Sequence, residues 1–184
     1  LRVNQLKSTR DNYLRSLTQA EIAATPCAIS ADGVVLHRPV DVGSLPGFSD
    51  GVASVQDSSA QLVARLLAPQ AGERILDACA APGGKACHLL ELQPNIEELV
   101  ALDISESRLQ RVIENTTRLD LRLTPLVADA SALPETRLAR PFEAILADVP
   151  CSATGVMRRN PDIKILRKFD DIAGFANQQL AILT

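Results

Sequence analysis

Apolar and polar positions follow one regular pattern from residue 75 onward. Short apolar runs are each followed by an amphipathic stretch whose apolar residues recur every three or four positions. Such runs predict strands and such stretches predict helices, so their alternation indicates βαβ units around a parallel sheet. We therefore predict an α/β fold for this part of the chain.

The periodicity also locates individual elements. Strands are predicted at residues 75–78, 99–102, 123–127 and 142–147. Helices are predicted at residues 85–92 and 172–183, from a Ser105 cap onward, and between Asp57 and Pro69. The helix after Asp57 would turn one apolar face inward, made of Leu62, Val63, Leu66 and Leu67.

Residues 1–48 follow a different pattern. Residues 1–24 have helical periodicity, whereas residues 26–45 mix apolar runs with Gly and Pro, which predicts short strands and turns. The segment 45–51, Leu-Pro-Gly-Phe-Ser-Asp-Gly, is rich in turn formers and marks a boundary. We predict a small α+β subdomain at residues 1–48 and a second domain at residues 49–184.

Composition and charge narrow the classes of function. The 184 residues are 46% hydrophobic and 22% charged, with a formal net charge of −3, as in ordinary globular proteins. This balance argues against a polycation that binds nucleic acid indiscriminately. No apolar run approaches the roughly 20 residues of a membrane span, and no signal peptide opens the chain, so a cytoplasmic protein is expected.

Cysteines and local charge carry weaker signals. Cys27, Cys79, Cys87 and Cys151 form no CxxC pair, so we expect reduced thiols and no metal site. Residues 1–20 and residues 151–184 each carry a modest excess of basic side chains that could contact RNA phosphates. A solvated surface is the simpler explanation of each excess by itself. The side chains proposed for these contacts are Arg10, Arg158, Arg159 and Lys164.

A glycine-containing loop follows the first strand of the predicted sheet. Cys79-Ala80-Ala81-Pro82-Gly83-Gly84-Lys85 leads directly into a helix, and Asp103 lies 20 residues after Gly83, at the end of the next strand. This arrangement is typical of a nucleotide cofactor site in which a carboxylate accepts both ribose hydroxyls. Asp129, after the third strand, could bind an adenine amino group, and a turn or helix cap is the alternative for it.

The loop fits S-adenosylmethionine better than two rival ligands. A P-loop fails because Cys79 stands at its first glycine and Ala86 at its Ser/Thr position, and no GxGxxG occurs for a dinucleotide. S-adenosylmethionine has no pyrophosphate and needs fewer cradling glycines. A simple strand–helix turn at Gly83-Gly84 is the alternative interpretation.

A second loop, Asp148-Val-Pro-Cys-Ser, follows the fourth strand. Enzymes that methylate exocyclic amines place Asn/Asp-Pro-Pro-aromatic here, so Cys151 indicates a different reaction. Cytosine C5 is a poor nucleophile until a thiolate adds to C6. A cysteine beside the target base is therefore consistent with methylation of cytosine C5. A buried structural cysteine is the alternative.

These motifs together resemble the NOL/NOP/Sun group of RNA cytosine-5 methyltransferases. The similarity includes Leu1-Arg-Val-Asn4, Val55-Gln56-Asp57, Asp77 to Lys85 and Asp148 to Gly155, and it extends over essentially the whole chain. It implies a Rossmann-like class I methyltransferase fold preceded by a small RNA-contacting subdomain.

The resemblance also assigns roles. Cys79 to Lys85 would wrap S-adenosylmethionine, Asp103 would hold its ribose and Asp129 its adenine, and Asp148 would face both cofactor and base. Cys151 would assist product release, because the attacking cysteine of the family lies in a Thr-Cys-Ser motif that these 184 residues do not contain. The implied partner is RNA, specifically small-subunit ribosomal RNA.

Three further expectations complete this hypothesis. The chain begins with Leu rather than Met, so we expect an excised fragment. Because it lacks the Thr-Cys-Ser motif, we expect it to be truncated at its C-terminus and inactive by itself. Its four strands would take the order 3-2-1-4 and self-associate through the unpaired edge of the fourth. A non-catalytic RNA-binding module is the alternative function, and an amine-directed methyltransferase is disfavoured by Cys151.

Overall fold

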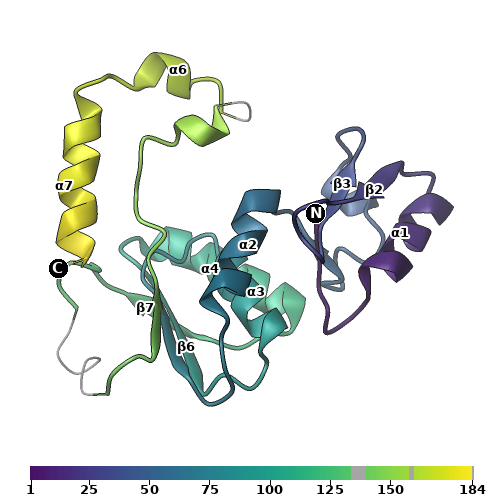
Figure 1. The fold of residues 1–184 in the computed structure, drawn as a ribbon, viewed down its shortest axis with the longest axis horizontal. Helices are drawn as coiled ribbons and strands as arrows, with labels where there is room; N and C mark the ends of the chain where they lie inside the picture. The colour runs from purple at the N-terminus through teal and green to yellow at the C-terminus, as the bar shows by residue number, and fades with distance from the viewer. Residues whose placement is uncertain (134–139, 158–159, 184) are drawn as a thin grey trace.

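A four-stranded parallel sheet organises the larger part of the molecule (Figure 1). The computed structural model describes residues 1–133, 140–157 and 160–183. The sheet has the order β7-β6-β5-β8, built from β5 (Arg74–Asp77), β6 (Glu98–Asp103), β7 (Thr124–Val127) and β8 (Ala144–Leu146). This confirms the four predicted strands, the α/β class and the predicted order 3-2-1-4.

Both faces of the two central strands, β5 and β6, are covered, as in parallel sheets generally. On one face, helices α2 (Ser58–Leu67), α3 (Gly84–Leu92) and α4 (Glu106–Leu119) contribute to a core that includes Ile75 of β5. On the other face, Leu76 of β5 packs against the segment after β7 and against Phe142. Because side chains alternate along a strand, the neighbouring residues of β5 serve opposite cores.

The predicted N-cap residues stand where two of these helices begin, and one of them makes a capping hydrogen bond. The Ser105 hydroxyl accepts a hydrogen bond from the Arg108 amide at 3.4 Å, which confirms Ser105 as the cap of α4. Asp57 occupies the N-cap position of α2 without a side-chain capping hydrogen bond. The predicted inner face of α2 is partly wrong, because Leu66 is 82% exposed while Gln61 and Ala64 are buried.

The N-terminal unit contains two short antiparallel pairs of strands and one helix. Strand β1 (Arg2–Val3) pairs with β4 (Ala53–Ser54), and β2 (Ala24–Pro26) pairs with β3 (Val34–Leu36). Helix α1 (Arg10–Gln19) is capped by Thr9 and buries Tyr13 and Leu17. Residues 45–51 form turns, with positive φ at Gly47 and Gly51, and Leu45 is the C-cap of a short 3₁₀ helix that precedes them (Val42–Ser44).

The expected helical start of this unit is wrong for its first residues. Arg2 and Val3 form a strand because both are buried and pair with a strand about 50 positions later in the chain. Such a partner cannot be read from local periodicity. The helix begins only at Arg10, after the Thr9 cap.

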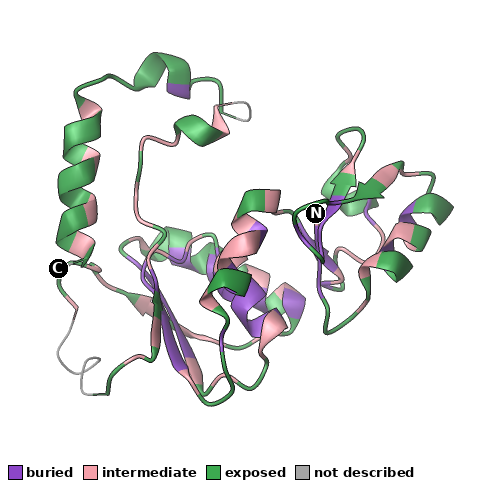
Figure 2. Cartoon of the chain, in the orientation of Figure 1, coloured by how far each residue is buried: buried purple, intermediate pink, exposed green. Residues whose placement is uncertain are grey.

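The C-terminal segment is much more exposed than the sheet (Figure 2). It contains a 3₁₀ turn (Thr154–Val156), the short helix α6 (Ile163–Leu166) and helix α7 (Asp171–Leu183). Helix α7 buries none of its residues fully and is tied to the sheet side by Gln179, whose amide donates to the Pro150 carbonyl at 2.9 Å. No helix among the described residues is long and apolar enough to span a membrane.

Candidate active site

Four carboxylates meet at the carboxyl ends of the sheet strands. Asp77 ends β5 and Asp103 ends β6, while Asp129 and Asp148 each lie two residues beyond the ends of β7 and β8. In open parallel sheets this edge is where ligands bind. The parallel order of the strands therefore brings together acidic residues that are more than 70 positions apart in sequence.

The loop between β5 and α3 depends on one glycine. Gly83 has φ +95°, and a Cβ there would lie 3.0 Å from Cγ1 of Val112 on α4. Gly84 is helical and a Cβ would meet nothing closer than 3.6 Å. Helix α4 also fixes the loop, because Asn115 donates to the Pro82 carbonyl at 2.9 Å. The close approach of the loop to α4, rather than two equivalent glycines, thus determines its shape.

One cavity of about 210 Å³ lies against this loop on the side of β6 and β7. Asp103 is 3% exposed there; its Oδ1 accepts the Ser105 amide at 3.0 Å, and its Oδ2 lies 3.4 Å from the Arg108 guanidinium. Asp129 is exposed, and hydrogen bonds from Ser131 lower its pKa. The cavity is lined by Ala78, Cys79, Ala81, Leu102, Asp103, Ile104, Arg108, Asp129, Ala130, Asp148, Pro150, Gln178 and Ile182.

A second cavity of about 200 Å³ lies on the other side of the same loop. It shares Cys79, Ala81 and Asp148 with the first cavity. Lys85, from the first turn of α3, forms an ion pair with Asp148 across it. The remaining lining comes from the start of α2 and the segment before it, from the end of β5 and from the loop: Val55, Gln56, Asp57, Ala60, Asp77, Ala80, Pro82 and Gly84.

Asp77 is the buried carboxyl group of this site. It is 1% exposed, and neither carboxylate oxygen accepts a hydrogen bond from a side chain of the described residues. Burial raises its pKa to about 7, although the Cys79 amide and the charge of Lys85 oppose this. A ligand with an ammonium group would supply the missing donors. S-adenosylmethionine carries such a group beside its ribose and adenine, so the residues present fit it.

The two cysteines of the site differ in their surroundings. Burial and the neighbouring carboxylates raise the pKa of the Cys79 thiol, so it stays protonated at neutral pH and is unsuited to nucleophilic attack. Cys151 is exposed, and its sulfur accepts the Ala153 amide at 3.4 Å. Its neighbour Pro150 lines the first cavity, whereas Cys151 itself lines neither cavity.

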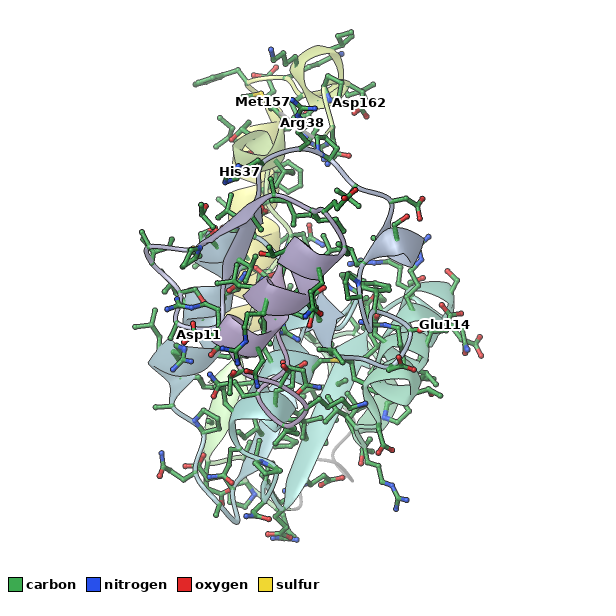
Figure 3. All side chains as sticks on the ribbon, turned by 90° about the vertical axis from the view of Figure 1, so that its right-hand side faces the viewer. Asp11, His37, Arg38, Glu114, Met157 and Asp162 are labelled. Atoms are coloured by element: carbon green, nitrogen blue, oxygen red, sulfur yellow. The ribbon has the colours of Figure 1, made fainter. Side chains whose placement is uncertain are left out.

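The proposed RNA contacts are less closely gathered. Lys164 is exposed on α6, and Arg10 is half-buried and donates to the Ser30 carbonyl at 3.3 Å. Arg158 and Arg159 lie outside the described residues. In Figure 3, His37 and Arg38 of the N-terminal unit lie at a height similar to that of Met157 and Asp162, but Figure 1 shows the N-terminal unit and the C-terminal segment on opposite sides of the molecule.

Sequence reasoning assigned no role in the site to three residues, Asp77, Gln56 and Arg108, although the first two belong to the motifs that carry the resemblance. Asp77 could have been recognised as a charged residue inside an otherwise apolar strand. Gln56 lines the second cavity, and Arg108 lies beside Asp103. Their positions depend on contacts between distant segments, so no local signal marks them. Among the described residues, no group of His, Cys, Asp or Glu side chains is arranged to hold a metal ion.

Comparison with known proteins gives matches along the whole chain. Residues 64–184 match a family model described as 16S rRNA methyltransferase RsmB/F, and residues 1–43 match one described as an RsmF/B-like, ferredoxin-like domain. A ribosomal RNA small subunit methyltransferase B from Pseudomonas syringae pv. tomato is 52% identical over 183 residues, and so is one from Shewanella oneidensis. The matches cover 100% of this chain but only 41% and 42% of those relatives.

A solved structure shares the fold. A methyltransferase homolog protein from Pyrococcus horikoshii superposes with a TM-score of 0.80 at 27% identity, over 99% of this chain and 57% of that one. The predicted Rossmann-like methyltransferase fold is therefore confirmed. The chain spans about two-fifths of the length of the curated relatives it matches.

Proposed function

Because this chain belongs to the 16S rRNA methyltransferase RsmB/F family, we propose that it forms the cofactor-binding part of an enzyme that methylates cytosine C5 in small-subunit ribosomal RNA. The observation that carries the proposal is the acidic crevice at the strand ends, with Asp103 buried beside one cavity and the Pro150-Cys151 loop adjoining it. Work on ribosomal RNA would place the enzyme in the cytoplasm.

The cofactor roles follow from the two cavities. Asp103, at the end of β6, is assigned to the ribose hydroxyls and Asp129 to the adenine. The loop Cys79 to Lys85 forms the wall between the cavities, and Asp77 faces the second of them beside Lys85 and Asp148. Asp77 is assigned to the ammonium group, since that group supplies the donors the carboxylate lacks.

The residues of this chain would orient the reaction at the base. S-adenosylmethionine, when bound, supplies the methyl group as an electrophile. Cytosine C5 becomes nucleophilic when a thiolate forms a bond to C6, and the product is freed when the C5 proton leaves and the carbon–sulfur bond breaks to return the thiolate. We assign Cys151 to this release and Asp148 to the meeting point of cofactor and base. The attacking thiol would come from a Thr-Cys-Ser segment, which these 184 residues do not contain.

Binding of the cofactor tests the enzyme proposal directly. Calorimetric titration of S-adenosylmethionine into the folded protein should show saturable binding that Asp103→Asn weakens. A non-catalytic RNA-binding module would bind RNA but not S-adenosylmethionine. Absence of cofactor binding would therefore contradict the proposal that the chain belongs to an enzyme.

A covalent trap tests the proposed chemistry. RNA carrying 5-fluorocytosine retains the protein because fluorine at C5 cannot leave as a proton does. We expect an adduct with the full-length Pseudomonas syringae relative and none with residues 1–184. An adduct through Cys151 would overturn the assignment of Cys151 to product release.

A further inference from the structure

Arg2 is the most completely buried charged side chain at the junction of the two units. Its side chain is 0% exposed, and its Nε and Nη2 donate to the two carboxylate oxygens of Glu91 at 2.9 and 2.7 Å. Its Nη1 donates to Oε1 of Gln56 and to the carbonyl oxygen of Gly84, both at 2.6 Å. One guanidinium of the N-terminal unit therefore contacts α3 near both of its ends, at Gly84 and Glu91, and the segment before α2, at Gln56.

Two of these contacts reach the walls of the cofactor crevice. Gly84 is the first residue of α3 and precedes Lys85, which forms the ion pair with Asp148. Gln56 and Gly84 both line the second cavity. Arg2 thus contacts two residues of the crevice wall and itself lines neither of the two cavities.

Simple attachment of the two units does not require this arrangement. Arg65 and Asp32 form a second ion pair across the same junction, and His88 of α3 lies 3.9 Å from Asp32. Apolar residues of similar volume often replace a buried ion pair without loss of stability. A planar group with several fixed donors is instead suited to holding several acceptors in one geometry.

We propose that Arg2 is a positioning residue that couples the N-terminal unit to the cofactor loop. By fixing the Gly84 carbonyl and the Gln56 amide, it sets where the first turn of α3 lies and so where Lys85 and the second cavity are formed. This inference rests on the proposed function for its ligand. It predicts that disturbance of β1 is transmitted to cofactor affinity.

Arg74 provides a matched control. Its side chain is 8% exposed, bonds to Glu98 at 2.9 and 3.0 Å and donates to the carbonyls of Arg140 and Pro141. It lies at the amino end of β5, away from the crevice. Arg2→Met and Arg74→Met therefore remove comparable buried interactions, and only the first is expected to alter the cofactor loop.

Two measurements on the intact chain separate positioning from stability. Calorimetric titration should show S-adenosylmethionine binding weakened roughly tenfold by Arg2→Met and unchanged by Arg74→Met, while both variants lower the melting temperature. Hydrogen exchange of the free protein should become faster in the first turn of α3 only in the Arg2 variant. Arg2→Lys, which keeps the charge without the planar fork, should lie between Arg2→Met and the unaltered protein.

The outcomes remain distinguishable if one arm fails. Failure of the unaltered protein to bind S-adenosylmethionine would count against the proposed function, while the exchange measurement would still decide the role of Arg2. Equal exchange and equal affinity in the two Met variants would overturn the inference. Glu91→Gln, which preserves shape and removes the charge that orients Arg2, gives the same test if Arg2→Met does not fold.

Discussion

At the scale of single residues, Asp77 makes the stability of the fold depend on pH. Its pKa is about 7 in the folded protein, compared with an ordinary value of 3.8, because burial disfavours the charged form. Between these values the unfolded chain loses the proton and the folded chain keeps it, so the contribution of Asp77 to stability falls as the pH rises from about 4 to about 7.

Asp77→Asn should remove this dependence. We expect the unaltered protein to lose stability relative to the variant across that interval, by a few kcal/mol in total. Chemical denaturation of both proteins at several pH values measures the difference, in which contributions of other groups cancel. Parallel pH profiles would contradict the buried, raised pKa of Asp77.

Asp103 and Asp129 line the same cavity but differ in burial, so their substitutions are expected to weaken cofactor binding to different extents. Asp103 is 3% exposed and charged hydrogen bonds formed there are shielded from water, so Asp103→Asn should weaken S-adenosylmethionine binding by about 1.5–3 kcal/mol. Asp129 is exposed and already engaged with Ser131, so Asp129→Asn should cost only a few-fold. Calorimetry on both variants checks the order, and the reverse order would refute the two assignments.

At the scale of elements, the junction of the β5 loop with α3 depends on Gly83 alone. Gly83→Ala forces a side chain into a φ of +95° and against Val112, so we expect a loss of stability of about 1–3 kcal/mol. Gly84→Ala places the better helix former at a helical position with room for it, and should be neutral or slightly stabilising. Thermal unfolding of the two variants makes the comparison, and equal losses would show that both glycines are required.

The elements that were predictable are those determined locally. The alternation of apolar runs and amphipathic stretches predicted the strands of the sheet. The two central strands, β5 and β6, are buried on both faces, whereas β7 and β8 keep exposed residues. Local patterns failed where a distant partner decides. Arg2 and Val3 are strand because of Ala53 and Ser54, and Gln61 faces inward because its amide donates to the Leu1 and Gln56 carbonyls at 3.1 Å.

The candidate site was predictable to a similar extent. Asp103, Asp129 and Asp148 follow strands, and parallel strand ends meet at one edge, so their convergence could be expected. The burial of Asp77 and the hydrogen bonds of Arg2 to Glu91, Gln56 and Gly84 depend on tertiary packing. Composition and motif spacing do not predict such packing. The RNA surface stays a prediction, since Arg158 and Arg159 lie outside the described residues.

At the scale of the whole molecule, the outer edge of β8 can pair with a strand of a second copy of the chain. No strand pairs with that edge within the described ranges, and Ile145 of β8 is 56% exposed. Such edges pair with other chains unless they are covered or charged. We expect this chain to form oligomers at high concentration and Ile145→Lys to reduce them, as measured by sedimentation velocity. Ile113→Lys on α4 is the control, and a monodisperse monomer would refute the expectation.

The Arg2–Glu91 pair also limits how this protein can be dissected. Glu91 is 3% exposed, and burial raises its pKa, a rise that the charge and hydrogen bonds of Arg2 and the charge of Arg118 oppose. A shortened version that begins after β4 would keep Glu91 and His88 and discard Arg2 and Asp32. The Glu91 and His88 side chains, which are buried in the intact chain, would then become exposed to solvent without these partners. The two units are consequently not interchangeable modules. A chimaera that joins either unit to a unit from another protein must keep the interface residues of both units.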